Sequence, residues 1–274
     1  MKKYTVSFTR LLLPGILLIF AACTKTGRRL PAEAANLCSI KSIGYTLVEG
    51  IRDTLVFTYD RLGRPVSALR NDVGTGSPNF LFRYDSRGNL QDYIGAYANG
   101  GAEFWTRYTY SKDNRTVWDT TYSLVSQYTV WPPTNFSAEL VATAIKKYDV
   151  QGRLIQIFTP YIPPIVFQDS VYIGHYQDYT YDANGDLEDQ GATYDDKINF
   201  HRTNKVWMLV DDQYSVNNPF PIDAYNGYGL PVKFNSILNN NPYPNYYPIL
   251  FGLIFGQTVI TYDCDVPKKD DASY

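Results

Sequence analysis

Acidic side chains are the residues of this sequence that come nearest to a catalytic set. Two suitably placed carboxyl groups are enough to hydrolyse a glycosidic bond, one as the acid and one as the base or nucleophile. Six acidic residues in the second half of the chain are candidates: Glu188, Asp189, Asp195, Asp196, Asp211 and Asp212. Because acidic residues are also common in turns, and the sequence does not fix the distances among these six, a glycan hydrolase is kept as the alternative function.

Few residues of this chain could support metal, redox or cofactor chemistry. Residues 182–188 alternate oxygen-bearing side chains as a calcium loop does, but Gly185 occupies the fourth place of that loop and not the sixth. His175 and His201 are isolated, and the sequence has no phosphate-binding, dinucleotide-binding, nucleophile-elbow or zinc-protease motif. We therefore expect a protein that is not an enzyme and that uses no cofactor and no metal.

A repeated phrase, Tyr-Asp followed by two free residues and Gly, organises the chain. In a hairpin turn Asp or Asn accepts from backbone N–H groups, and Gly or Asn adopts the positive φ that closes the turn. Ser111 and Asn114 occupy these two places in one degraded copy. The other copies place their turn residues at Asp60 and Gly63, Asp85 and Gly88, Asp149 and Gly152, Asp182 and Gly185, and Asn226 and Gly229. The repeat is therefore interpreted as scaffold and not as a repeated active site.

Strand-like runs separated by these turns predict an all-β fold. We expect an antiparallel meander of hairpins that forms one curled or folded sheet, with uneven, proline-broken loops between the copies. The exception is the segment 203–213, where Thr203-Asn204 can cap a short helix. A buried strand over 207–210 is the other possibility there, and the helix is preferred. The predicted domain spans 37–265, followed by a loose tail at 266–274.

The N-terminus predicts export and lipid attachment. Lys2 and Lys3 precede the apolar run 11–20, which is too short to span a bilayer, although a single membrane anchor stays open as the other interpretation. Residues 20–23, Phe-Ala-Ala-Cys, resemble a bacterial lipobox, which implies cleavage after a signal peptide at 1–22 and lipidation of Cys23. Residues 23–36 then form a flexible tether. Thr24 favours the outer membrane, with the periplasmic and the cell-surface side both open.

Two cysteines remain after Cys23. Cys38 and Cys264 lie near the two ends of the predicted domain. In an oxidising envelope an even pair is typical of a disulfide, which would join the first and last strands. Two buried free thiols are the alternative, because a sequence gives no geometry.

Composition narrows the choice of partners. The chain has 25 basic and 27 acidic residues and a formal net charge of −2, which argues against a nucleic-acid partner. Its 25 Tyr, 14 Phe and 4 Trp suit both a sheet and a binding surface for a polysaccharide or an envelope protein. The candidate contact residues are Trp105, Trp118, Trp131, Tyr243, Tyr246 and Tyr247.

The order of these features resembles one protein family. The lipobox, an early Cys-Ser-Ile strand, the Tyr-Asp repeats, the stretches 194–200 and 214–218, and the terminal Tyr-Asp-Cys are similar to small YD-repeat, Rhs-like lipoproteins of Bacteroidota. The resemblance covers most of the chain. It implies an all-β lipoprotein of the outer membrane and brings no activity with it.

Overall fold

The computed structural model describes residues 38–46, 52–71, 77–98, 101–126, 136–167, 170–188, 193–235 and 257–265. All of them lie in the second of the two units into which the chain divides, Pro31–Tyr274. The predicted signal peptide, tether and C-terminal tail, with Cys23, fall outside the described residues, as do Trp131, Tyr243, Tyr246 and Tyr247.

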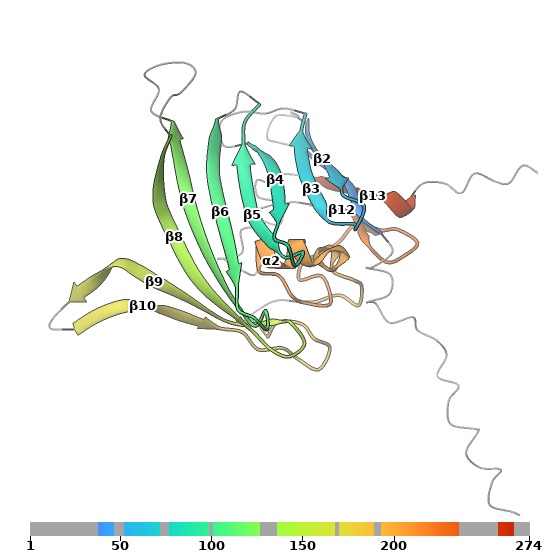
Figure 1. Cartoon of the computed structure of the whole chain (residues 1–274). Helices are drawn as coiled ribbons and strands as arrows, with labels where there is room; N and C mark the ends of the chain where they lie inside the picture. The colour runs from blue at the N-terminus through green and yellow to red at the C-terminus, as the bar shows by residue number, and fades with distance from the viewer. Residues whose placement is uncertain are drawn as a thin grey trace, which may run out of the picture. The chain divides into compact units, whose positions relative to one another are not determined.

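The described residues form one antiparallel sheet of 13 strands (Figure 1). Its strands are β1 (Ile40–Thr46), β2 (Arg52–Tyr59), β3 (Pro65–Arg70), β4 (Asn79–Tyr84), β5 (Leu90–Ala96), β6 (Ala102–Tyr110), β7 (Thr116–Ser126), β8 (Phe136–Tyr148), β9 (Leu154–Phe167), β10 (Ser170–Asp178), β11 (Ala224–Tyr225), β12 (Pro231–Phe234) and β13 (Thr258–Tyr262). The helical elements are η2 (Phe200–Thr203), α2 (Lys205–Asp211) and η4 (Asp263–Asp265).

The sheet is a meander, as predicted. Its strands follow the order β10 to β1 without a crossover, and β13, β12 and β11 continue beyond β1. β13 lies beside β1 with Ile43 opposite Ile260, so the last part of the described chain extends the edge formed by the first. Among the described residues β10 and β11 are the two edge strands, and the sheet is open.

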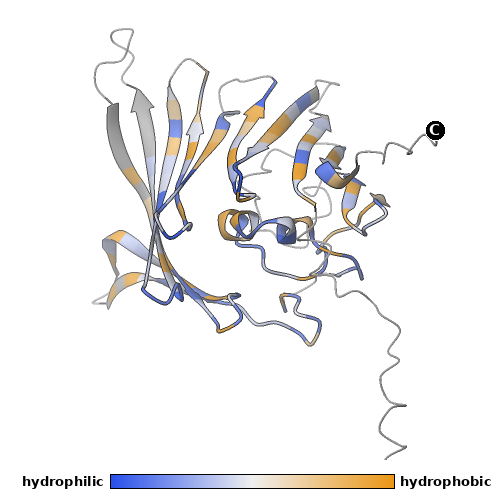
Figure 2. Ribbon diagram, turned by 45° about the vertical axis from the view of Figure 1, so that its right-hand side comes forward, coloured by the Kyte–Doolittle hydropathy of each residue, from blue (hydrophilic) through white to orange (hydrophobic). Residues whose placement is uncertain are grey.

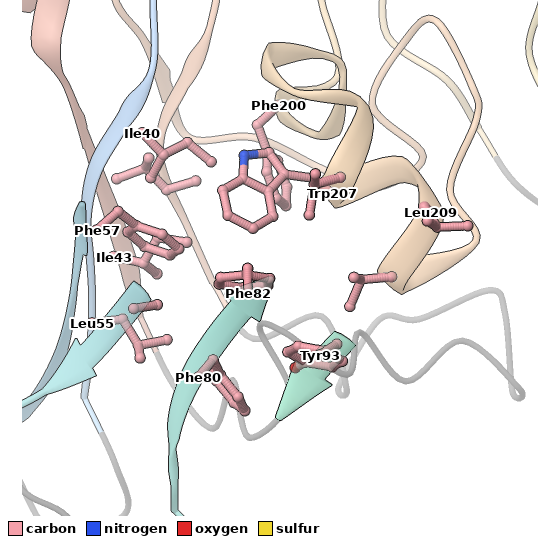
Figure 3. Close-up of a cluster of buried hydrophobic side chains, with 14 of the residues drawn as sticks. Ile40, Ile43, Leu55, Phe57, Phe80, Phe82, Tyr93, Phe200, Trp207 and Leu209 are labelled. Atoms are coloured by element: carbon pink, nitrogen blue, oxygen red, sulfur yellow. The ribbon is translucent and has the colours of Figure 1, made fainter. Parts of the chain in front are cut away.

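The predicted helix is confirmed and packs on one face of the sheet. Asn204 caps α2, because its side chain accepts a hydrogen bond from the N–H of Val206. Trp207 of this helix is fully buried, and its ring contacts those of Phe57 and Phe82 at centroid distances of 5.4 and 5.5 Å (Figure 3). Apolar and polar residues alternate along several strands (Figure 2), and the buried side chains of the strands form one core cluster with those of α2, so one face of the sheet is turned toward this helix. We call this the inner face and the opposite one the outer face.

The Tyr-Asp turns have the geometry that the sequence predicted. The Asp60 carboxylate accepts from the N–H groups of Leu62 at 2.9 Å and Arg64 at 3.0 Å, and Gly63 has a φ of 72°. The side chain of Arg64 also donates to Asp60, which lowers the pKa of this carboxyl. The degraded copy keeps the geometry, because Asn114 has a φ of 58°. These Asp residues therefore serve the turns.

The tyrosine of the phrase has a role that the sequence did not reveal. In four copies, and in the terminal Tyr-Asp-Cys, the tyrosine hydroxyl donates to the carbonyl of a residue at the start of a strand. These bonds are Tyr59 to Ile40, Tyr84 to Pro65, Tyr110 to Leu90, Tyr181 to Leu154 and Tyr262 to Pro231. The guanidinium of Arg64 also lies over the Tyr84 ring at 4.5 Å. The bonds of Tyr84, Tyr110 and Tyr181 thus join one copy to the copy before it, whereas the Tyr148 hydroxyl contacts that of Tyr214 and the Tyr225 hydroxyl donates to Asp195.

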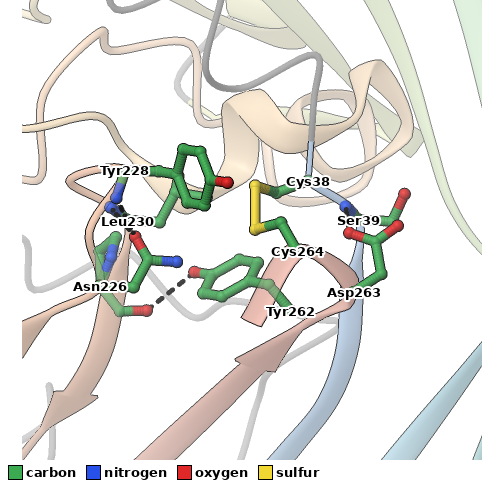
Figure 4. The surroundings of a disulfide bond; sticks show 9 residues. Cys38, Ser39, Asn226, Tyr228, Leu230, Tyr262, Asp263 and Cys264 are labelled. Carbon is green, nitrogen blue, oxygen red and sulfur yellow. Dashed lines mark hydrogen bonds between the residues drawn. A yellow bond between two sulfur atoms is a disulfide. The ribbon is translucent and has the colours of Figure 1, made fainter. Parts of the chain in front are cut away.

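A disulfide joins Cys38 to Cys264, with their Cα atoms 5.3 Å apart (Figure 4). Beside it, Asp263 accepts from the N–H of Ser39 at 2.7 Å. The bond connects residues that are 226 positions apart, next to β1 and β13, so it ties the two ends of the described chain. No helix in the described parts of the chain is long and apolar enough to cross a membrane.

Candidate binding surface

The outer face of β4–β10 carries side chains that the core does not use. On β6, Phe104 and Tyr108 point to the inner face with the buried Tyr93 of β5, so Trp105 and Arg107, which alternate with them, point outward. On β7, Val117 is buried on the inner face, which places Trp118 on the outer one. Both tryptophans that the sequence proposed as contact residues, and that the structure describes, therefore share this face.

The strand register arranges this outer surface in three rows. The first row is apolar and consists of Leu81, Ile94, Trp105, Tyr122 and Leu140. The second row is polar and consists of Arg83, Asp92, Arg107, Thr120 and Thr143. The third row is mainly aromatic and apolar and consists of Thr109, Trp118, Ile145, Phe158 and Tyr176. We call these fifteen residues the outer-face rows.

Trp105 is fixed in place by its neighbours. Its indole N–H donates to the Asp92 carboxylate at 2.8 Å, and the guanidinium of Arg107 lies 4.7 Å from its ring centroid. Arg107 also donates to Asp92 at 3.1 Å, and the Tyr122 ring lies 5.5 Å from that of Trp105. Because the Trp105 ring is already held in place, it loses little conformational entropy when a ligand binds against it.

The third row offers the more accessible rings. Trp118 is 41% exposed and Tyr176 61%. Tyr176 packs on Phe158 with ring centroids 4.6 Å apart, and a Cβ on Gly174 would come within 2.7 Å of the Phe158 ring. The glycine is therefore needed for this close approach.

Along β7, Trp118 and Tyr122 are four residues apart, which corresponds to about 13 Å. The polar row with Arg107 lies between the two apolar rows. Aromatic faces attract the partly positive C–H edges of a sugar ring, and guanidinium and hydroxyl groups bind sugar hydroxyls. The surface can therefore hold a chain of sugar rings, whereas a single ring is too short to reach both ends.

On the inner face, at the end of α2, two carboxylates share one ammonium group. The buried Lys146 lies 3.0 Å from Asp119 and 2.8 Å from Asp212. Although burial favours the neutral amine, Asp212 and Asp119 raise the pKa of Lys146 well above its usual value. Burial in turn raises the pKa of Asp212 to about 6, and Lys146 opposes this only in part. The cluster ties α2 to β7 and β8.

Beside this cluster a cavity of about 160 Å³ lies between α2 and three hairpin turns. Its lining includes Leu90, Val117 and Leu209 and the phenols of Tyr148 and Tyr214, whose hydroxyls lie 3.3 Å apart. Burial raises the pKa of both phenols. None of the lining residues is acidic, so the cavity itself does not supply a pair of carboxylates.

Of the two histidines considered from the sequence, His201 is buried and His175 is exposed. His201 is fully buried between Asn199 and Asp211, each 2.9 Å from one of its ring nitrogens. This arrangement joins η2 to α2. His175 lies on β10, where its ring is 5.9 Å from that of Tyr161.

The five candidate carboxylates that the structure describes do not form one site. Asp211 binds His201, whereas Asp212 binds Lys146. Asp195 accepts from the backbone and side chain of Asn218 and from the Tyr225 hydroxyl, and Asp196 pairs with Lys197. Glu188 is exposed, and Asp189 lies outside the described residues.

The calcium-like stretch is used by the turn. The Asp182 carboxylate accepts from the N–H groups of Asn184 at 2.8 Å and Asp186 at 2.9 Å. Asp186 accepts from Asn217 at 2.7 Å. These oxygens hold the backbone in the arrangement that the turn interpretation predicted.

Sequence reasoning missed four residues of these sites: Arg107, Tyr122, Asp119 and Lys146. A signal for the first two was present, because Trp105 and Arg107, like Trp118 and Tyr122, are separated by even numbers of residues within predicted strands and so share a face. Lys146 and Asp119 carried no such signal, because their partner Asp212 is distant in the sequence.

No protein-family model matches this chain, and a search of the curated proteins finds no match to it.

Proposed function

We propose that this protein is a lipid-anchored, non-enzymatic binding protein of the bacterial outer membrane, and that its outer-face rows bind a polysaccharide. The observation that carries the proposal is the shared orientation of Trp105, Tyr122 and Trp118 on either side of the polar row that contains Arg107. The lipobox-like residues 20–23 support the anchor, and the resemblance to YD-repeat lipoproteins supports the location.

A polysaccharide fits this surface better than a protein partner does. The core of a protein interface is its most apolar part, whereas here the polar row with Arg83, Asp92 and Arg107 runs through the middle of the surface. Arg107 keeps 45% of its side chain exposed while it contacts Asp92, so N–H groups remain for hydroxyls. An extended sugar chain also alternates apolar ring faces with hydroxyl groups, so it is complementary to these rows.

Affinity electrophoresis tests the proposal. The full chain is run in native gels that contain one of a panel of soluble glucans, xylans, mannans or pectins, and we expect at least one of them to retard it. Trp118→Ala should weaken the retardation about tenfold, because one stacked aromatic residue contributes about 1–1.5 kcal/mol. Arg107→Ala should weaken it as well, since it removes both hydrogen-bond donors and the support of Trp105.

Tyr228→Ala is the matched control. Tyr228 is 45% exposed, close to the 41% of Trp118, but it lies in the turn between β11 and β12 near the disulfide (Figure 4). Its loss should not change the retardation. Migration unaffected by every glycan, or equal effects of Trp118→Ala and Tyr228→Ala, would refute the outer face as a glycan site.

The alternative function, an envelope glycan hydrolase, has one observation in its favour. Asp212, with its raised pKa, lies with Asp119 around one ammonium, and an acid with a raised pKa beside a second carboxylate is typical of glycosidases. Lys146, however, occupies the space between the two carboxylates. Release of new reducing ends from the retained glycan, lost in Asp212→Asn, would support the hydrolase instead of the binding protein.

A further inference from the structure

The edge strand β10 has an open hydrogen-bonding side. The N–H of Tyr179 donates to the carbonyl of Ile155 at 2.9 Å, continuing the register in which Gln177 is opposite Ile157. Because antiparallel strands alternate between bonded and non-bonded pairs, the N–H and C=O groups of Gly174, Tyr176 and Asp178 point away from β9. Within the described parts of the chain no strand pairs with this side of β10.

The hairpin of β9 and β10 is also unusually apolar for an edge. It pairs with β8 only over Leu154–Phe158 and then diverges from it (Figure 1). Between Arg153 and Asp178 the sequence contains one acidic residue, Asp169, and no Lys or Arg. Ile162, Ile165, Val171 and Ile173 are 50–63% exposed. Native edge strands are usually protected by charge or by brevity, and here the bulge between Tyr172 and Gly174 leaves Gly174–Asp178 regular.

A second copy of this chain fits the open side. A two-fold axis at Tyr176 would place Tyr176 opposite Tyr176 of the other copy and Gly174 opposite Asp178, so every outward N–H and C=O of this segment meets a partner. No two carboxylates face each other in this register, and Asp178 already accepts from Gln156 of its own chain at 2.7 Å.

The opposite edge explains why pairing would stop at two copies. β11 has only the residues Ala224–Tyr225, and its register with β12 is irregular. A head-to-tail stack of β10 on β11 would therefore have too few hydrogen bonds, whereas β10 on β10 uses the same strand twice and closes the assembly.

We infer that this protein forms a symmetric dimer by antiparallel pairing of Gly174–Asp178 with the same segment of a second copy, with Tyr176 on the two-fold axis. The third of the outer-face rows, which ends at Tyr176, then continues into the same row of the second copy. The pairing rests on the β10 edge alone and holds whether or not the outer face binds a glycan.

Sedimentation equilibrium of the full chain in density-matched detergent, with a charge-swap pair, tests this inference. The unmodified chain should show a monomer–dimer equilibrium. Tyr176→Lys and Tyr176→Glu should each raise the dimer dissociation constant at least about tenfold, because like charges meet on the axis. An equal mixture of the two variants should restore the dimer, since only a residue that faces itself allows rescue by opposite charges. Rescue also shows that both variants are folded.

The matched control is Ile162→Lys, with its partner Ile162→Glu. Ile162 is 62% exposed and Tyr176 61%, but Ile162 lies on β9 and not on the β10 edge, so neither control variant should change the dimer. The inference is overturned if the unmodified chain sediments as a monomer, if its assemblies keep growing with concentration, or if mixing the Tyr176 variants restores nothing.

Discussion

The tyrosine of the Tyr-Asp phrase is predicted to stabilise the sheet through its hydroxyl. Tyr84→Phe removes the hydrogen bond to the carbonyl of Pro65, which is 2.7 Å long, and leaves the ring beneath Arg64. Pro65 is buried, so its carbonyl oxygen does not regain a full bond to water. Burial of the Tyr84 hydroxyl also raises its pKa, so the phenol is neutral and can donate at neutral pH.

The expected loss of stability follows from the free energy of the lost hydrogen bond. A net hydrogen bond contributes about 0.5–1.5 kcal/mol, and an unsatisfied buried acceptor costs about 1–3 kcal/mol. Because the phenol is half-buried and Pro65 is its partner in the preceding hairpin, we expect Tyr84→Phe to lower the free energy of unfolding by about 1–2 kcal/mol. Tyr110→Phe and Tyr181→Phe should cost similar amounts, since they remove the same bond from other copies.

Urea unfolding under non-reducing conditions, followed by far-ultraviolet circular dichroism, measures this cost. Tyr228→Phe is the control, because the Tyr228 side chain is 45% exposed and lies outside the outer-face rows and the β10 edge. The midpoint should fall for Tyr84→Phe at an unchanged slope, and it should stay constant for the control. Equal midpoints for both variants would refute the idea that the Tyr84 hydroxyl stabilises the sheet through its bond to the preceding copy.

Three further predictions concern the turns, the disulfide and the buried ions. Gly152→Val should lower stability by about 1–2 kcal/mol in thermal melts, because Gly152 has a φ of 79°; an unchanged melting temperature would contradict the turn geometry. Reduction of the Cys38–Cys264 bond, which closes a separation of 226 residues, should cost up to about 5 kcal/mol on the chain-entropy estimate, and a thiol titration of the denatured, non-reduced chain that finds both thiols free would contradict the bond. The pKa of Asp212 is raised from 3.8 to about 6, so between these two pH values the folded state binds a proton that the unfolded state does not bind. The contribution of Asp212 to the free energy of unfolding therefore grows as the pH falls through 6 and is lost as the pH rises. Asp212→Asn should remove this dependence from urea midpoints between pH 7 and 4.5, and an identical pH profile of variant and parent would contradict it.

The turns and the meander could be predicted because local chemistry fixes them. Asp60 with Gly63, and even the degraded pair Ser111 with Asn114, specify a tight turn within a few residues. The short helix was predictable for the same reason, since Asn204 caps it locally. Such signals survive in a single sequence because they depend on neighbours along the chain and not on the rest of the fold.

The sites depended on contacts that no local pattern encodes. Alternation predicts that Trp105 and Arg107 share a face, but only the packing of Trp207 against Phe57 and Phe82 decides which face is the core. Lys146 contacts both Asp119 and Asp212 only because the end of α2 packs against β7 and β8. The sequence left the pairing of the last two cysteines open because it contains no distances.

A structure of the full chain with a bound oligosaccharide, taken from the polysaccharide that retards it most strongly, tests the proposed function most directly. We predict that the sugar rings lie on the outer face, stacked on Trp118 and hydrogen-bonded to Arg107. Sugar rings on the inner face, beside Asp119 and Asp212, would contradict the proposal and favour the hydrolase.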